Sequence, residues 1–172
     1  VDEAYAEFAD DTSYASALEL RGVRERLIVL RTFSKAYALA GLRVGYAVAP
    51  RELVSRLRAV HVPFNVNSLA QAAALAALED RAHLSRTLEH NARERLRIGA
   101  ALERLGLRVA PSQTNFLLVD LQRTAAEVQR ALRERGVTVS YPGPPLSHHL
   151  RISLGSVEDN DRMLRELGAL LS

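Results

Sequence analysis

The chain has 172 residues, a formal net charge of +3 at pH 7, 48% apolar residues and no cysteine. This length allows one domain with part of another, and the apolar fraction is enough for a substantial core. Without cysteine the chain can form neither disulfides nor thiolate metal sites, which fits a cytoplasmic protein. No stretch approaches 18 unbroken apolar residues, so we expect no membrane association.

The basic charge makes nucleic-acid binding the first alternative to weigh. Residues 81–110 carry seven arginines against three glutamates. Because these arginines alternate with acids along a predicted helix with few aromatics, a solvated helix face explains them better. The five histidines show no ligand spacing with carboxylates. We therefore expect no nucleic-acid partner and no metal site.

The first part of the chain predicts two short strands followed by helices. Residues 27–33 (LIVLRTF) and 45–49 (GYAVA) are apolar and β-prone, and Pro50 ends the second strand. A helix is predicted from 51 (RELVSRLRAV), and another begins at an Asn67 or Ser68 cap. Since the chain opens with valine, directly on VDEAY, we expect a fragment that lacks an N-terminal part.

A long helix over about 82–105, ended by Gly106, precedes a change of composition. Four strands are predicted after it, at 107–111, 114–121, 137–140 and 149–155, with a helix at 124–135 and a last helix capped by Ser156 and Asp159. We therefore divide the chain into residues 1–80 as the remainder of an α/β body, 81–106 as a connecting helix, and 107–172 as a small α+β domain.

Lys35 is the only lysine beside 22 arginines. Arginine stays protonated, whereas lysine can lose its proton and form a Schiff base, and a strand end is where α/β folds bind ligands. Thr32 and Ser34 add hydroxyls, and Arg43 adds a guanidinium that suits phosphate. A cofactor with both an aldehyde and a phosphate would use this set, which describes pyridoxal phosphate. Chance survival of a surface lysine is the alternative.

The pyridine ring of that cofactor needs an acid beside its nitrogen to stay protonated. Asp2 is the candidate, and Tyr5 could hydrogen-bond the phenolic oxygen of the ring. Residues i and i+3 of a strand face opposite ways, so this pairing requires the strand to end near Asp2.

Five sequence motifs follow one another along nearly the whole chain: DEAY, RTFSKAYALAGLRVGY, HVPFNVNSLAQAAALAAL, PSQTNFLLV and LRISLG. Together they resemble the second half of the fold-type I pyridoxal-phosphate aminotransferases of class I/II, and among these the histidinol-phosphate aminotransferases. The resemblance implies an α/β fold: the C-terminal part of the large domain, a mostly parallel sheet with helices, followed by the small α+β domain.

The resemblance also implies roles for the residues around the lysine. Lys35 would bind the cofactor and then move a proton between the substrate carbon and the cofactor carbon. Asp2 would pair with the pyridine nitrogen, and Tyr5 would hold the phenolic oxygen. The partners implied are an amino acid, a 2-oxo acid and a second subunit in a homodimer.

Ser34 and Arg43 would bind the cofactor phosphate, with Thr32 a weaker candidate. Arg151 would grip the substrate carboxylate, since Leu150 and Ile152 alternate onto the other face of the strand. Ser140 stands where members that act on histidinol phosphate usually have an arginine, which leaves an aromatic or other amino acid open as substrate.

Two further readings of the resemblance remain. A threonine-phosphate decarboxylase or similar lyase would use the same lysine, and a non-catalytic regulator could carry a related module. The family's glycine-containing phosphate loop and several other cofactor contacts precede this segment, so we expect the 172 residues alone to be inactive.

Overall fold

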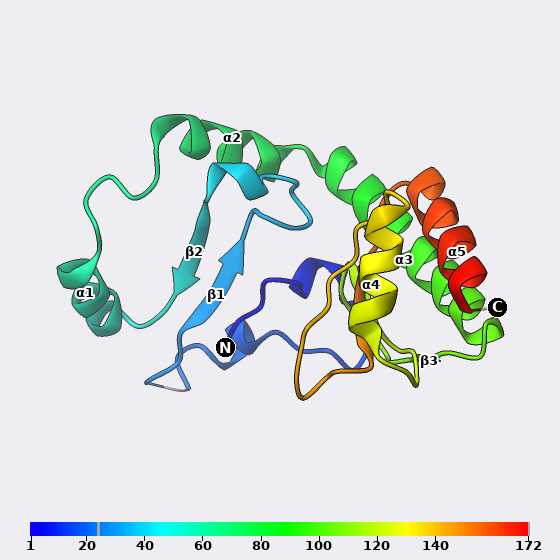
Figure 1. Ribbon diagram of the computed structural model, residues 1–172. Coiled ribbons are helices and arrows are strands. Elements are labelled where there is room, and N and C mark those ends of the chain that lie inside the picture. Colours follow the sequence, from blue (N-terminus) through cyan, green and yellow to red (C-terminus); the bar gives the residue numbers. More distant parts are fainter. Residues whose placement is uncertain (24, 172) are drawn as a thin grey trace. The chain divides into compact units, whose positions relative to one another are not determined.

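The structure is a computed structural model that describes residues 1–23 and 25–171 (Figure 1). It divides into two compact units, Val1–Leu88 and Glu89–Ser172. The boundary falls inside helix α3 (Arg81–Arg104), the long helix that the sequence predicts. The assignment of residues 81–106 as a connector between two domains stays a prediction.

The first unit is built on strands β1 (Val29–Thr32) and β2 (Gly45–Val48), which lie side by side in Figure 1. They pair antiparallel, with Thr32 opposite Gly45. The single bridge of Asp2 to Leu30 is parallel and lies along the other edge of β1. Both predicted strands are therefore confirmed, each slightly shorter than predicted because the ladder ends where the chain turns.

Helices α1 (Arg51–Val60) and α2 (Ser68–Glu79) complete this unit, with short 3-10 helices at Ala6–Phe8, Ala17–Leu20 and Ala40–Leu42. The Asn67 side chain accepts a hydrogen bond from the Ala70 amide, which confirms one of the two predicted caps. A small core joins the end of β1 to α2, made of Phe33, Val44, Ala70 and Ala74.

The second unit is a three-stranded antiparallel sheet in the order β3 (Arg108–Val109), β4 (Phe116–Asp120), β5 (His149–Ser153). Helices α4 (Ala125–Glu134) and α5 (Val157–Leu171) belong to it, and Ser156 caps α5 as predicted, accepting from the Asp159 amide. Residues 137–140 are not the predicted strand. Only Ser140 bridges Arg151, because the prolines that follow cannot donate to a ladder.

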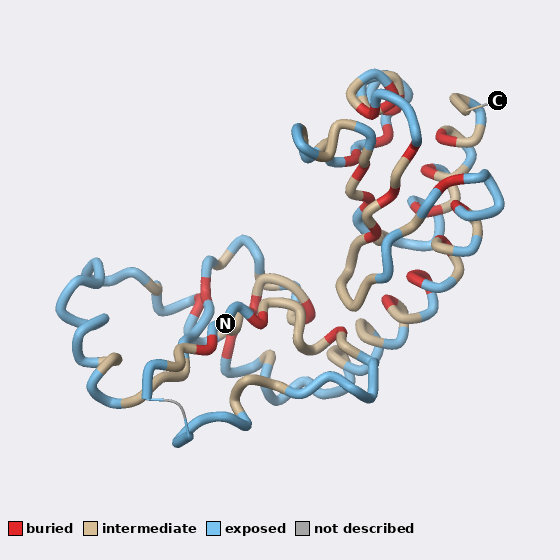
Figure 2. Tube along the Cα trace, turned by 90° about the horizontal axis from the view of Figure 1, so that it is seen from below, coloured by how far each residue is buried: buried red, intermediate tan, exposed pale blue. Residues whose placement is uncertain are grey.

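Buried residues alternate with mostly half-buried ones along β4 and β5, so one face of this sheet makes the core (Figure 2). The helices α3, α4 and α5 each contribute a buried side to the same cluster, through residues that include Ile98, Leu102, Leu132, Met163 and Leu167. Gly106 and Gly136 follow the ends of α3 and α4 and adopt φ of +78° and +76°, as expected for glycines just beyond a helix.

We predict that Leu102→Ala lowers the free energy of unfolding by about 2–5 kcal/mol, because Leu102 is 0% exposed and its loss leaves a cavity in this core. Leu96→Ala on the same helix is the matched control. Leu96 is 72% exposed, so its truncation costs less than about 1 kcal/mol. Urea denaturation of both variants measures the difference, and equal losses would contradict the placement of the α3 core face.

Candidate active site

Lys35 lies in a tight turn immediately after β1. Its carbonyl accepts from the Ala38 amide at 2.9 Å, and the Phe33 carbonyl accepts from the Leu39 amide at 2.9 Å. The neighbouring Ala36 is completely buried, which anchors the turn. These contacts fix the backbone of a half-buried lysine at the carboxyl end of a strand, the position where α/β folds bind ligands.

Tyr5 is the predicted site residue that the structure brings to the lysine. The Lys35 Nζ atom lies 5.4 Å from the centroid of the Tyr5 ring. Asp2 forms an isolated bridge and its Oδ1 accepts from the Ala4 amide at 3.0 Å, so the chain turns directly after Asp2. The strand therefore ends where the sequence argument required it to end.

The hydroxyl candidates Thr32 and Ser34 flank the buried Phe33, and the arginine candidate Arg43 precedes Val44. The Phe33 amide donates to the Val44 carbonyl at 3.1 Å, which brings the backbone beside Ser34 close to that beside Arg43. Thr32 Oγ1 accepts from the Ser34 amide at 3.1 Å. Arg43 is exposed, has φ of +52° and donates from Nη1 to the Ala40 carbonyl at 2.6 Å. Thr32 thus orients the backbone of Ser34, while the Arg43 guanidinium bonds within its own turn.

Glu3 and Arg31 form a buried ion pair that the sequence argument missed. Arg31 Nε donates to Glu3 Oε2 at 2.8 Å, and Glu3 also accepts from Ser16 Oγ at 2.9 Å and the Ala17 amide at 2.6 Å. Arg31 pairs with Glu7 as well, at 3.2 Å. This cluster ties the segment that carries Asp2 and Tyr5 to the strand that leads to Lys35.

Burial by itself would raise the pKa of Glu3, whose residue is only 7% exposed. The hydrogen bonds from Ala17, Ser16 and Arg31, together with the charge of Arg31, outweigh burial and hold the pKa of the Glu3 carboxyl below its ordinary value. The carboxylate is therefore ionised at neutral pH. The only sequence signal for this pair is the position of Glu3 between Asp2 and Tyr5. No local pattern indicates that its partner is Arg31, 28 residues away.

An apolar cavity of about 300 Å³ lies at the opposite end of the strand pair from Lys35. Its lining includes Val29 at the start of β1, and Val48 and Pro50 at the end of β2. None of its lining residues is a predicted site residue. The candidate chemistry therefore belongs to the turn after β1 and not to this cavity.

Arg151 lies on β5 in the second unit, between the buried Leu150 and Ile152. Its half-buried side chain is on the sheet face opposite the core, as the alternation predicts. The guanidinium carbon lies 4.0 Å from the centroid of the Phe116 ring. Phe116 was missed as a site residue because its nearness to Arg151 depends on the register of β4 and β5.

Neither a metal site nor a membrane span was found within residues 1–23 and 25–171. No group of three or more histidines and acids is arranged there to hold a metal ion. No helix in the same described part of the chain is long and apolar enough to cross a membrane.

Residues 1–167 match the family model described as aminotransferase class I and II. The chain belongs to this family. Along its whole length it is 42% identical to the histidinol-phosphate aminotransferase of Moorella thermoacetica, of which it covers 45%. The chain thus spans about half the length of the curated aminotransferases it matches.

Solved structures agree with the family in fold. The histidinol-phosphate aminotransferase from Sinorhizobium meliloti, solved in complex with pyridoxal-5'-phosphate, matches 99% of this chain with a TM-score of 0.89 and 32% identity, and the match covers 47% of that chain. The L-threonine-O-3-phosphate decarboxylase from Porphyromonas gingivalis matches 99% of this chain with a TM-score of 0.85 and 30% identity. That match covers 54% of the decarboxylase chain. The predicted aminotransferase fold is confirmed.

We predict that Glu3→Gln lowers the free energy of unfolding at pH 7 by about 1.5–3 kcal/mol, because it removes the charged acceptor of Arg31, whose side chain is only 15% exposed. The pKa of Glu3 is depressed in the folded state, so its contribution is present above the ordinary value of 4.5 and is lost as pH falls through the folded value. The difference between wild type and variant should therefore shrink below about pH 4.5.

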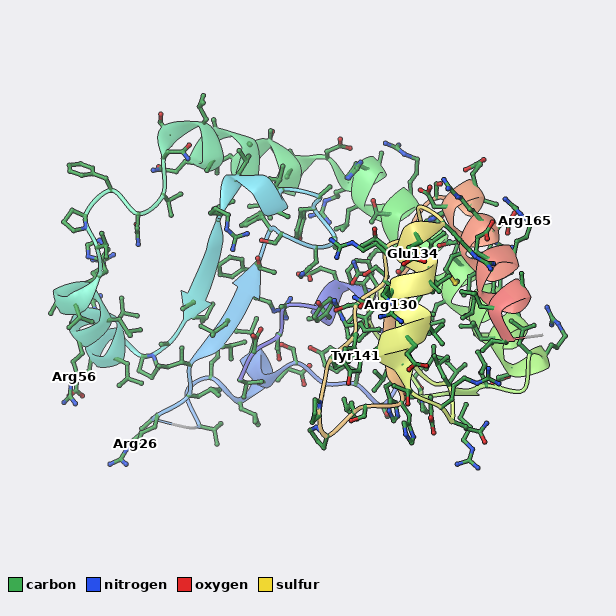
Figure 3. The ribbon with its side chains drawn as sticks, in the orientation of Figure 1. Arg26, Arg56, Arg130, Glu134, Tyr141 and Arg165 are labelled. Carbon is green, nitrogen blue, oxygen red and sulfur yellow. The ribbon has the colours of Figure 1, made fainter. Side chains whose placement is uncertain are left out.

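Glu52→Gln is the control for this prediction. Glu52 and Arg56 pair at 2.6 Å on the exposed side of α1, where Arg56 projects outward (Figure 3). An exposed pair contributes little, so this change should stay within about 0.5 kcal/mol of wild type at every pH. Urea denaturation at intervals of about one pH unit between pH 3 and pH 8 measures the free energy of unfolding of both variants. A Glu3→Gln loss that is constant with pH would contradict the ionised pair.

Proposed function

We propose that the protein is a pyridoxal-phosphate-dependent aminotransferase that moves an amino group between histidinol phosphate and 2-oxoglutarate in histidine biosynthesis. The observation that carries this proposal is Lys35, the only lysine of the chain, in the turn after β1 with its Nζ beside the Tyr5 ring. The 42% identity to a histidinol-phosphate aminotransferase supports the same donor.

The chemistry of the donor set fits pyridoxal phosphate. An amine, a carboxylate and a phenol come from Lys35, Asp2 and Tyr5, on a turn and a strand end that share β1. Ser34 and Arg43 follow and would hold the phosphate, with Thr32 fixing the Ser34 amide. When bound, this cofactor supplies an electron sink for the bond broken at the substrate carbon.

Each residue has a distinct task in this proposal. The Lys35 amine would hold the cofactor and would also serve as the acid and base that moves a proton. The Asp2 carboxylate would keep the pyridine nitrogen protonated, and the Tyr5 hydroxyl would donate a hydrogen bond to the phenolic oxygen. Arg151 takes the carboxylate of the substrate through the two parallel N–H groups of its guanidinium.

A lyase is the second candidate, because the decarboxylase from P. gingivalis matches with a TM-score of 0.85. It would use the same lysine, and the residues that bind the substrate would decide which of its bonds is broken. Product analysis separates the two. Carbon dioxide release without amino transfer supports the lyase, and amino transfer to a 2-oxo acid supports the aminotransferase.

The family also suggests the assembly, location and domain organisation of the protein. We propose that it is a homodimer in the cytoplasm. Its substrates are an amino acid and a 2-oxo acid. Residues 1–80 belong to the cofactor-binding domain, 81–106 connect it, and 107–172 form the small domain. The chain covers 45% of the relative from M. thermoacetica, and the cofactor contacts that the family has in its other half would complete the site.

We predict that borohydride reduction of the full protein with pyridoxal phosphate adds the mass of one reduced cofactor to the peptide that contains Lys35. Lys35→Arg keeps the charge and removes the nucleophilic amine, so its peptide should gain no cofactor mass and amino transfer should fall by at least about a thousandfold. Peptide mass mapping and a coupled assay measure the two. A cofactor adduct elsewhere with Lys35 unmodified would contradict the proposal.

A substitution at Ser140 tests whether histidinol phosphate is the amino donor. It is exposed and its backbone pairs with Arg151, the proposed carboxylate ligand. We predict that Ser140→Arg raises kcat/KM for histidinol phosphate by about 10- to 100-fold, since a guanidinium adds a charged hydrogen bond to the phosphate. An unphosphorylated aromatic donor is the internal control and should gain nothing. Equal changes for both donors would show that residue 140 does not contact the phosphate.

A further inference from the structure

We infer that Phe116 is a positioning residue for Arg151: its ring holds the guanidinium in one orientation and so presents it to a carboxylate ligand. This inference rests on the proposed role of Arg151 in binding the substrate carboxylate. The sequence and the family match assign no role to Phe116.

The sheet register places the two side chains on one face. Strand β4 pairs with β5 so that Leu118 is opposite Arg151 and Phe116 is opposite Ser153. Phe116 and Arg151 are therefore diagonal neighbours, within reach of an aromatic ring and a long side chain. The measured separation, 4.0 Å from Cζ to the ring centroid, is well inside the range of a cation–π contact.

The backbone on both sides of this pair is fixed. The Phe116 carbonyl accepts from the hydroxyls of Ser112 at 2.7 Å and Thr114 at 3.1 Å. Arg151 donates its amide to the Ser140 carbonyl at 2.8 Å and accepts from the Ser140 amide at 3.0 Å. The long Arg151 side chain extends from this fixed backbone, and the ring of Phe116 packs against its guanidinium.

A ring on the flat face of a guanidinium leaves the N–H donors in the plane of the group, because those donors point outward from its edge. Such an edge matches the two oxygens of a carboxylate. Restricting the side chain beforehand lowers the entropy lost when the ligand binds. Phe116 should therefore act on carboxylate affinity, and not on cofactor binding or on the chemical step.

Phe116 is not a member of the buried core. It is half-buried on the sheet face opposite Leu117 and Val119, which supply the core contacts of β4. Phe116→Leu therefore removes the ring without opening a cavity in that core. Phe116→Tyr keeps the ring and serves as the conservative variant.

The test uses the full-length protein and succinate, a dicarboxylate that cannot be transaminated, with binding measured by calorimetry. Phe116→Leu should weaken succinate binding by about 2- to 30-fold, the range of cation–π contacts from exposed to desolvated. Phe116→Tyr should stay within about twofold of wild type. Cofactor affinity, kcat and the melting temperature should change little, while KM for the 2-oxo acid rises with the succinate Kd.

A double-mutant cycle distinguishes positioning from a general structural effect. Arg151→Gln removes the cation, so adding Phe116→Leu to it should weaken succinate binding less than about twofold further. An equal loss in both backgrounds, or no loss in the wild-type background, overturns the inference. So does a wild type that binds no succinate, because Arg151 then holds no carboxylate.

The same titrations distinguish a failure of the proposed function from a failure of the inference about Phe116. The succinate titrations are run with and without added pyridoxal phosphate. A protein that binds no cofactor contradicts the proposed function, yet its succinate binding still reports whether Phe116 acts through Arg151.

Discussion

The buried ion pair between Glu3 and Arg31 is the interaction on which the first unit depends. The pair joins the segment before the first 3-10 helix to β1, and through Ser16 and Ala17 it fixes the start of the second 3-10 helix. Removing Arg31 would leave Glu3 charged and buried, which is costly in a way that breaking an exposed pair is not. Asp2 and Tyr5 flank Glu3, so the ion pair also sets the position of the residues proposed to face the cofactor.

The second unit uses a comparable arrangement. Glu94 on α3 is almost fully buried, accepts from Arg97 and from Asn160 on α5, and thereby links the two helices. The hydrogen bond from Arg97 is the main reason that the pKa of Glu94 lies below its ordinary value despite burial. In both units a satisfied buried charge fixes the framework, and the proposed ligand-binding side chains Lys35 and Arg151 lie at strands which that framework holds.

Much of the candidate site could be predicted from local sequence. Lys35 was found because it is the only lysine and follows an apolar strand, and both signals lie within ten residues. The assignment of Asp2 and Tyr5 to the same cofactor ring required the strand to end near Asp2, and the turn in the structure meets that condition. Glu3 and Phe116 were not found, because what distinguishes each is a partner 28 or 35 residues away.

The sequence by itself determined the helices, most strands, the Asn67 and Ser156 caps and the aminotransferase family, since periodicity, capping and motifs are properties of neighbouring residues. It overestimated residues 137–140 as a strand, because β-prone residues form one only where a partner edge and donors are available. Only the tertiary structure decided which charges are buried as pairs and which ring lies on Arg151. These depend on strand register and burial, which long-range packing sets and local sequence does not encode.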